Sequence, residues 1–555
     1  KTSLVPEVGM GGPTWSRATA AWRFNDLGYL RQIPSGCADF GGARLVRNFI
    51  RNSALDNAVW TNTGLTVTAG QTDYLGGTSA FLLMETAATS NHDIRDDGVS
   101  PGAGLAMMIS CVVKANGRDQ VRILDNAYNA ISATFNLSTV TSVSTVGTST
   151  ITDLGGGYYK CVAKTTGSIS NNPFFPRIYL FNGTTSYAGD ITKGVILSHV
   201  QVSSVTGYDA SYIPEYVSVG VLSSPYHGAG ADGCKYFATD WQGAPIATAN
   251  LLKVRREASA INNLLYSRDL SNAAWSTKTN ITAAKTATGL DGIANTATTL
   301  TATAADATIL QPTSGIASAA RCASAYVKRR TGTGVISFTQ DGGSTWTDIT
   351  SQINSSTWSR VQITATLANP SVGFKISTSG DAIDVDCVQN EAGAEATSPI
   401  VTTTATITRN ADSLAYQTAG NIDFAVGTAF VGLSCPSSSY GGFPLACTAS
   451  GRIIYCLGST QVRTYDGTTI VSQNSSTHLN GGKSKIASSW SNISSLLKLT
   501  ANGSAISSGA FDGAMGSGAT INIGGENSSV SSAYIGPVAI YNYQMTDAEL
   551  QAITT

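Results

Sequence analysis

Three carboxylates near residue 390 are the side chains that the sequence places best for cleaving a sugar. Asp384 and Asp386 alternate along a strand-like run, so both face the same side, and Glu391 follows closely. A glycosidase needs two carboxylates a few ångströms apart across the scissile bond. Ordinary structural strands show the same alternation. We therefore predict no catalytic residues and keep these three as the ones that an enzymatic alternative would need.

The densest polar cluster is the stretch 92–97, His-Asp-Ile-Arg-Asp-Asp. Carboxylates from one loop suit hard cations such as calcium, which makes Asp93, Asp96 and Asp97 the candidate metal ligands. The same stretch, followed by Gly98, also fits a solvated loop. We favour the loop and predict neither a metal site nor a cofactor.

Other chemistry finds little support in the sequence. The run 228–233 matches G-x-G-x-x-G, but a strand-like run follows it where a dinucleotide site needs a helix. The chain has four His and no G-x-S-x-G, so a serine hydrolase is not indicated. A net charge of −1 predicts no nucleic-acid partner. No apolar run approaches 18 residues, which predicts no membrane insertion.

Aromatic residues in turn-rich segments are the candidates for contacting a glycan. Tyr440 precedes two glycines, and Tyr465 and Asp466 precede Gly467, so we name these three as glycan-binding residues. Trp60 and Trp275 could also stack on a sugar. Their fixed position within a repeated pattern favours the alternative, that they anchor a hydrophobic core.

The elements that must position these residues are duplicated. Trp60 stands twelve positions after Asn48 (60 − 48), and Trp275 stands twelve positions after Asn263 (275 − 263). The offset of 275 − 60 = 215 residues is far longer than a solenoid period, so it predicts a repeated domain. Further pairs follow at shrinking offsets, as expected if the second copy has shorter loops: Leu55 with Leu270, 110–114 with 324–328, 158–162 with 358–362, and Gln201 with Gln389.

Composition predicts strands joined by many turns. Charged residues make up only 12%, and 57 glycines with many hydroxyl and amide residues carry the polarity instead. Short strand-like runs separated by turn signals indicate β-sandwiches. The exceptions are a hairpin around residues 25–28 and a short helix at 547–553, which Thr546 and Glu549 start as a capping box.

The nine cysteines form no C-x-x-C pair and mostly lie in apolar runs, so we predict small buried strand residues. A disulfide between two of Cys435, Cys447 and Cys456 is the alternative. The chain starts at Lys1 without a signal-peptide pattern, and both a removed leader and a longer gene product remain open.

These patterns predict an all-β, multidomain chain with two jelly-roll sandwiches and a third sandwich. The first lead-in hairpin is too short to bury much and should pack onto a neighbouring domain. The expected segments are a lead-in at 1–46, a first jelly roll at 47–218, a second lead-in at 219–262, a second jelly roll at 263–400, a linker at 401–412 and a last domain at 413–555.

The second repeat, with the run 263–267, Trp275, 389–391, 397–400 and 408–412, resembles carbohydrate-binding-module-like jelly rolls of tailed-bacteriophage structural proteins. The first repeat departs from that pattern, since Ser203 stands where the second has Glu391. The last domain resembles a laminin-G or concanavalin-type lectin sandwich through the runs 486–490, 499–503 and 535–542.

The resemblance implies a non-enzymatic virion protein on the outer surface of a phage particle, such as a head fibre, decoration or tail fibre protein. It implies contact with other virion proteins through the N-terminal region, a host surface glycan as ligand, and a homo-oligomer with a trimer as the candidate state. Two alternatives are a tailspike-type polysaccharide depolymerase and a purely structural capsid cement.

Overall fold

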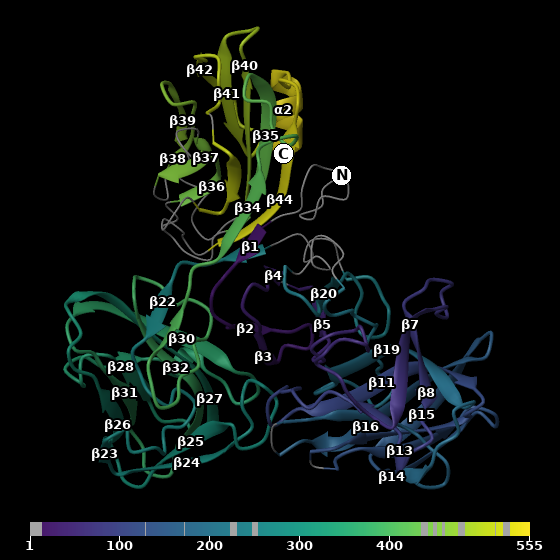
Figure 1. Cartoon of the computed structure of the whole chain (residues 1–555). Coiled ribbons are helices and arrows are strands. Elements are labelled where there is room, and N and C mark those ends of the chain that lie inside the picture. The colour runs from purple at the N-terminus through teal and green to yellow at the C-terminus, as the bar shows by residue number, and fades with distance from the viewer. Residues whose placement is uncertain are drawn as a thin grey trace. The chain divides into compact units, whose positions relative to one another are not determined.

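The computed structural model describes residues 14–555 except 41, 128, 171–172, 222–229, 247–253, 435–441, 448–451, 458–460, 475–482, 517 and 526–532. The chain divides into two compact units, one of residues 43–246 and one of residues 1–42 together with 247–555. Nearly all the regular structure is strand, which confirms the predicted all-β class (Figure 1). Among the described helices, none has the length and apolar character to cross a membrane.

The first sandwich lies in the unit 43–246 and consists of two six-stranded antiparallel sheets. Its first sheet has the order β14 (Thr141–Val146), β13 (Ser132–Asn136), β12 (Gln120–Asp125), β17 (Pro176–Leu180), β10 (Asp93–Arg95) and β6 (Thr61–Thr63). Its second sheet has the order β15 (Thr148–Gly155), β16 (Tyr158–Ser168), β11 (Ala106–Asn116), β19 (Gly194–Ser204), β8 (Ala80–Glu85) and β7 (Leu65–Gln71). A small ribbon pairs β9 (Thr89–Asn91) with β18 (Ser186–Ala188).

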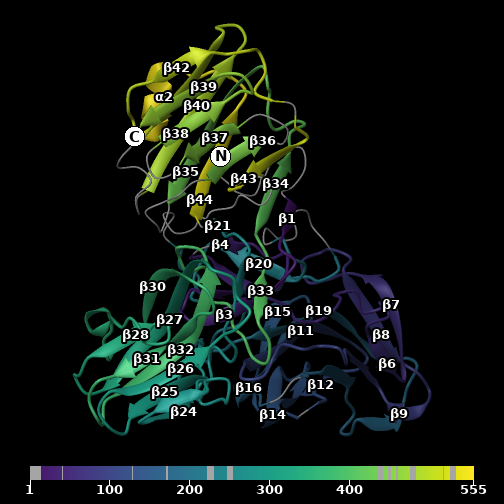
Figure 2. The ribbon, with the colours of Figure 1, turned by 90° about the vertical axis from the view of Figure 1, so that its left-hand side faces the viewer.

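The second sandwich repeats this plan with five strands in each sheet, and Figure 1 and Figure 2 show its two layers. One sheet has the order β23 (Thr277–Thr279), β26 (Ala307–Pro312), β31 (Ser371–Ile376), β28 (Ile336–Thr339) and β29 (Thr347–Asp348). The other has the order β24 (Ile281–Ala287), β25 (Ala297–Ala302), β32 (Ala382–Ala392), β27 (Ala319–Thr331) and β30 (Ser359–Leu367). A single 3₁₀ turn, η1 (Thr350–Gln352), follows β29.

Alternation of apolar and polar residues explains why these segments form sandwiches. In β12 every second residue is buried, and in β10 and β17 the isoleucines Ile94 and Ile178 point into the core. Trp60 belongs to the core of the first sandwich and Trp275 to that of the second. The eight described cysteines are all buried, as predicted. Cys435 lies outside the described residues, so a disulfide that includes it stays an untested alternative.

An asparagine clasp, repeated in both sandwiches, shows the duplication at atomic detail. Asn48 donates from Nδ2 to the carbonyls of Val200 (3.1 Å) and Val217 (2.9 Å). Asn262 donates in the same way to Val388 (3.1 Å) and Ile400 (2.9 Å).

A glutamine completes each clasp. Gln201 accepts from the Val217 amide, and Gln389 accepts from the Ile400 amide, both at 2.8 Å. The structural counterpart of Asn48 is therefore Asn262 and not Asn263, so the register expected from the tryptophans is wrong by one residue at this end.

Each of the first two sandwiches is also flanked by a pair of short strands, one preceding it and one following it in the sequence. In the first, β5 (Arg44–Arg47) pairs with β20 (Cys234–Phe237). In the second, β22 (Ala260–Asn262) pairs with β33 (Ile407–Arg409). Residues expected in the second lead-in and in the extended linker thus form closing strands, because each leading strand needs a partner for its backbone.

The C-terminal sandwich consists of two seven-stranded sheets that take strands from three parts of the chain. One has the order β1 (Thr14–Ser16), β34 (Ser413–Gln417), β43 (Thr520–Ile523), β36 (Gly442–Cys447), β37 (Arg452–Leu457), β38 (Gln461–Tyr465) and β39 (Ile470–Asn474). The other has the order β4 (Asp39–Phe40), β21 (Val254–Arg256), β44 (Ala533–Tyr541), β35 (Val426–Ser434), β40 (Lys483–Ser491), β41 (Leu496–Ala501) and β42 (Ser507–Ala510). The sheets of this sandwich thus extend beyond the expected range 413–555, because β1, β4 and β21 cover edges that would otherwise be open.

The predicted hairpin and helix are both present. β2 (Ala21–Phe24) and β3 (Leu30–Ile33) pair across the turn at Asn25–Gly28. Leu30 of this hairpin packs against Leu290 and Cys387, so the hairpin covers the second sandwich and not the first, which follows it in sequence. Helix α2 (Asp547–Thr554) starts with the expected capping box of Thr546 and Glu549.

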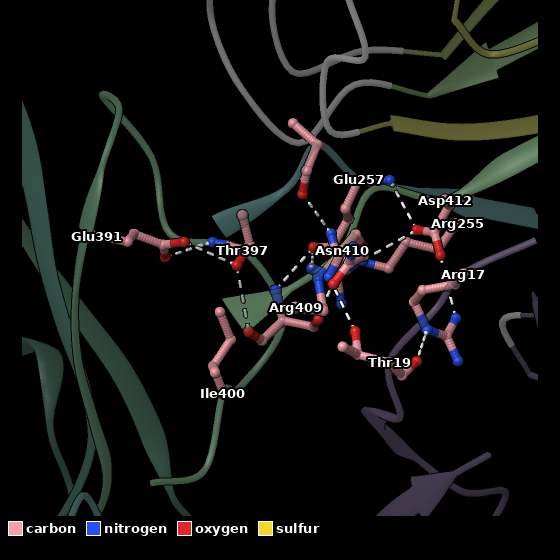
Figure 3. A network of polar contacts seen from close by, with 12 residues as sticks. Arg17, Thr19, Arg255, Glu257, Glu391, Thr397, Ile400, Arg409, Asn410 and Asp412 are labelled. Carbon is pink, nitrogen blue, oxygen red and sulfur yellow. Dashed lines mark hydrogen bonds and ion pairs between the residues drawn. The ribbon is translucent and has the colours of Figure 1, made fainter. Parts of the chain in front are cut away.

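A buried polar network ties the N-terminal segment to the strands around residue 400 (Figure 3). Glu257 lies at its centre: it pairs with Arg255 (2.6 Å) and Arg409 (3.2 Å) and accepts from the hydroxyl of Ser398 (2.6 Å). Asp412 extends the network by pairing with Arg409 (3.2 Å) and with Arg17 (3.1 Å). Because Arg17, Glu257 and Arg409 are buried, their pairing fixes the path of the chain between the sandwiches of this unit.

Candidate functional site

A row of charged side chains crosses the outer face of the first sheet of the first sandwich. In β10, β17 and β12 the residues next to the core isoleucines point away from the core. Strand register then brings Arg95 opposite Arg177, and Asp93 opposite Tyr179. Tyr179 lies opposite Arg122 in turn. Three neighbouring strands thus build one polar face.

Asp93 holds this face together. Its side chain is fully buried and accepts from Arg177 through Nε and Nη2, both at 2.8 Å. Arg95 donates to the same carboxylate at 3.3 Å and to Asp97 at 2.8 Å. Partial burial alone would lower the pKa of Arg95, but the hydrogen bond to Asp97 and the charges of both aspartates raise it. The Arg95 guanidinium is therefore held as a cation.

Beside these arginines lies an open cleft of about 640 Å³, which we call the outer-face cleft. It is lined by Thr63, Arg95, Asp97, Asn126, Ala127, Pro173, Phe175 and Arg177.

The cleft offers both donors and acceptors. Among the described residues, Arg95 Nη2 and the Asn126 amide nitrogen have no hydrogen-bond acceptor. Asn126 Oδ1 accepts from Arg177 (2.9 Å), which orients the amide. The carboxylate of Asp97 is 41% exposed and can accept. Partly exposed Phe175 adds an aromatic wall.

The charges around the cleft balance. Arg95 and Arg177 are matched by Asp93 and Asp97, so no large net charge faces the solvent. A hydroxyl group donates one hydrogen bond and accepts others, so a ligand with several hydroxyls matches this mixture of fixed donors and acceptors. An anion would compete with Asp93 and Asp97 for arginines that are already paired.

The second sandwich serves as an internal reference for this face. Gly64 and Asn280 both have positive φ (62° and 50°) at the same point of the fold, which makes Thr63 and Thr279 equivalent. From that register, the positions of Asp93, Arg95, Arg122, Arg177 and Tyr179 correspond to Thr308, Leu310, Ser337, Gly373 and Lys375. The fold therefore forms without the arginine–aspartate cluster, and the cluster is a feature of the first sandwich alone.

The candidate metal ligands do not converge. Asp93 is bound by Arg177 and Arg95, while Asp96 accepts from the backbone (2.9 Å) and side chain (2.6 Å) of Arg51. Asp97 pairs with Arg95. In the part of the chain that the structure describes, no three His, Cys, Asp or Glu side chains are grouped to hold a metal ion.

The three carboxylates near residue 390 are all engaged. Asp386 accepts from Arg268 at 2.7 and 2.9 Å, and Asp384 accepts from Arg330 at 3.1 Å. Glu391 accepts from the amide (2.7 Å) and the hydroxyl (2.8 Å) of Thr397. Burial raises the pKa of Glu391, although hydrogen bonds from Thr397 and Gln389 oppose this. These contacts hold the strand in place and leave no open pair of carboxylates.

Of the glycan-binding residues expected in the C-terminal sandwich, the structure describes Tyr465 and Asp466. Tyr440 lies outside the described residues. The hydroxyl of Tyr465 donates to the carbonyl of Gly467. Asp466 is buried and accepts from the amides of Thr468 and Thr469 and, through its other oxygen, from the amide of Asp512. Tyr465 and Asp466 thus stabilise a turn.

Trp60 and Trp275 anchor the two cores, which favours the core interpretation over sugar stacking. They are 6% and 1% exposed, and their indole N–H groups donate to the carbonyls of Asn52 and Tyr266. Sequence reasoning missed Arg122, Asn126, Phe175 and Arg177. Only the cluster 92–97 pointed toward this face, since the other residues of the face lie far from it along the chain.

No family model and no curated protein matches this chain. Similar solved structures include the CBM40 of the Ruminococcus gnavus IT-sialidase bound to α2,3-sialyllactose, with 16% identity over 24% of this chain and 84% of that one, at a TM-score of 0.20. Another is the CBM22-1–CBM22-2 tandem of Paenibacillus barcinonensis Xyn10C, with 13% identity over 64% and 100%, at 0.22. A third is LG4–5 of the mouse laminin α1 chain, with 9% identity over 43% and 86%, at 0.19. At such low scores, the function has to be argued from the cleft itself.

Proposed function

We propose that this chain is a non-catalytic saccharide-binding protein whose first sandwich holds an uncharged glycan in the outer-face cleft. The observation that carries the proposal is the set of donors and acceptors that Asp93 fixes around the cleft. Side chains already held in place lose little entropy when a ligand binds. Phe175 adds an apolar wall for the C–H face of a sugar ring.

A single open cleft of this kind binds weakly, so function would depend on many copies. Linking several sites raises the overall affinity without new contacts. The low content of charged residues, 12%, fits a surface that meets hydroxyl-rich partners. We therefore propose that the protein acts as a homo-oligomer, with a trimer as the first state to test.

We further propose that the protein is a head fibre, decoration or tail fibre protein on the outer surface of a tailed-phage particle, where it meets other virion proteins and a host glycan. The resemblance of the second repeat to jelly rolls of tailed-bacteriophage structural proteins supports this. Strands β1 to β4 are paired within their own unit, so this proposal does not assign the contact with the particle to them.

The enzymatic alternative has less support, because Asp384, Asp386 and Glu391 are all engaged by arginine or threonine partners. A depolymerase needs one carboxylic acid to protonate the leaving oxygen and a second carboxylate beside it. A capsid cement would bind no saccharide, so a glycan-binding experiment distinguishes it from the proposed function.

A glycan array probed with the full chain tests the proposal. We expect binding to uncharged hexose-containing glycans and loss of that binding in Arg177→Ala, while Arg330→Ala, an exposed arginine of the second sandwich, binds as the wild type does. Incubation with the bound glycans should release no new reducing ends. Binding of none of the glycans, or equal binding by Arg177→Ala, would refute the saccharide site in this cleft.

A further inference from the structure

The face of the second sandwich that corresponds to the outer-face cleft carries a different set of residues. Strand register aligns one residue from each of five strands across the sheet β23-β26-β31-β28-β29, namely Thr279, Thr308, Lys375, Ser337 and Asp348. Three of these carry hydroxyl groups, and all lie on the side away from the core, which holds the neighbouring Ile309, Phe374 and Phe338. The face is thus polar and presents the hydroxyls of Thr279 and Thr308, while Ser337 is buried.

Trp346 stands at the edge of this face, directly before β29. The core of the second sandwich contains Trp275 but not Trp346, which is partly exposed. A tryptophan that leaves part of its ring in water gains less from burial than a core residue does. Its position therefore calls for a reason other than core packing.

The turn before Trp346 fixes where its ring lies. Asp341 accepts from the Thr339 hydroxyl (2.8 Å) and the Thr345 amide (2.9 Å). Gly342 and Gly343 adopt positive φ of 76° and 91°, a conformation that glycine takes without strain. A Cβ on Gly343 would lie about 3.0 Å from the Trp346 ring, so the ring packs closely over a bare backbone.

The surroundings of Trp346 carry a net negative charge, because Asp341 in the preceding turn and Asp348 on the sheet face add to one ion pair. The Lys375 ammonium lies 5.9 Å from the ring centroid and pairs with Asp306 at 3.3 Å. Gly373, the counterpart of Arg177, adds no side chain, and a Cβ there would collide with the backbone of Ile309. The Trp346 ring thus lies beside a sheet surface on which Gly373 adds no side chain, with hydroxyl groups and the Lys375–Asp306 ion pair nearby.

We propose that this face is a second saccharide-contact site, the Trp346 platform, on which the apolar C–H face of an uncharged pyranose stacks while Thr308 meets its hydroxyls. The inference rests on the proposed saccharide-binding function and extends it to the second sandwich. The carboxylates of Asp341 and Asp348 favour a neutral sugar over an anionic one. The two repeats then present equivalent faces with different chemistry: a cleft of arginines and aspartates in one and a stacking platform in the other.

The test uses the full chain with maltohexaose, cellohexaose and mannohexaose as probes in titration calorimetry. We expect Trp346→Ala to lose one class of sites and to bind the matching immobilised polysaccharide about tenfold more weakly. Trp346→Phe should retain most of the binding because it keeps an aromatic ring. Tyr543→Ala, which removes a 45% exposed aromatic ring from the C-terminal sandwich, should bind as the wild type does.

The variants separate this inference from the proposed function. If Arg177→Ala loses binding and Trp346→Ala does not, the cleft stands and the platform is refuted. If Trp346→Ala loses binding and Arg177→Ala does not, the platform stands and the cleft is refuted. If the wild type binds none of the probes, the platform as stated is refuted, whereas binding of a different uncharged glycan on the array would still support the cleft.

Discussion

Asp93 balances the charges of the outer-face cleft. It is fully buried, yet it accepts three hydrogen bonds from two arginines, and Arg177 and Arg95 themselves are only 13% and 22% exposed. A buried carboxylate is stable only while its partners remain, and the reverse holds for the arginines. The shape of the cleft and the stability of the sheet around it therefore depend on the same residue.

Replacing Asp93 with Asn should lower the free energy of unfolding of the first sandwich by about 3 kcal/mol, because Arg177 loses its carboxylate partner and Arg95 loses one of two. Urea unfolding followed by circular dichroism measures this. The matched control is Asp97→Asn at a 41% exposed position, where we expect a loss below about 1 kcal/mol. Equal effects of the two substitutions would show that Asp93 does not hold the arginines in place.

Much of this site was beyond prediction from the sequence. The cluster 92–97 is conspicuous, but Arg177 lies 84 residues away from Asp93, and only strand pairing brings the two together. The sequence density of acidic residues suggested metal ligands, whereas the structure pairs Asp93, Asp96 and Asp97 with arginines. Trp346 stood out even less, because its role depends on the register of β28 and β29.

Among the elements, the two asparagine clasps show the duplication most directly, because they make equivalent contacts in both sandwiches. Each asparagine is buried and makes four hydrogen bonds to backbone groups, which join the strand before a sandwich to its last strand and to the segment after it. No other uncharged side chain of that size offers two N–H donors and one oxygen that accepts two hydrogen bonds in this geometry. The clasp thus requires Asn48 in the first sandwich and Asn262 in the second.

Asn48→Ala and Asn262→Ala should each destabilise their own sandwich by about 3 kcal/mol, because several buried backbone groups lose partners. Differential scanning calorimetry should show a different transition shifted in each variant. Asn263→Ala tests the register directly: Asn263 is only partly buried and bonds to the Asn390 carbonyl, so its loss should cost less. A larger loss in Asn263→Ala than in Asn262→Ala would reverse our assignment of the clasp.

Sequence patterns predicted the strands, the repeat and the closing helix well, because alternation and capping are local signals. They did not predict which strands complete the C-terminal sandwich. β1 and β4 have three and two residues, too few for a periodic pattern, and their partners β34 and β21 lie hundreds of residues away. Such pairings follow from open sheet edges that need covering, which is a property of the folded sheet.

At the scale of the whole molecule, the network around Glu257 couples the unit of residues 1–42 and 247–555 to pH. Burial alone would raise the pKa of Glu257, but the charges of Arg255 and Arg409 and the hydrogen bonds from Ser398 lower it to about 2. An unfolded glutamate has a pKa of about 4.3. The stabilisation is therefore complete above the unfolded pKa and is lost as the pH falls toward 2.

The difference between the folded and unfolded pKa values of Glu257 corresponds to about 3 kcal/mol of unfolding free energy near neutral pH. Glu257→Gln should remove that stabilisation at pH 7 and flatten the fall in stability between about pH 5 and pH 2. Urea unfolding at several pH values measures both effects. A variant that keeps the wild-type slope over this range would mean that Glu257 is not the group that titrates.

The central claim is that the outer-face cleft of the first sandwich binds an uncharged saccharide, and titration calorimetry with the best glycan from the array tests it most directly. The account predicts saturable binding by the full chain that changes little between 50 and 500 mM salt (about one decade), since no net charge is involved. It also predicts at least about tenfold weaker binding for Arg177→Ala, with Arg330→Ala unchanged. Binding that disappears at high salt, or that survives in Arg177→Ala, would contradict it.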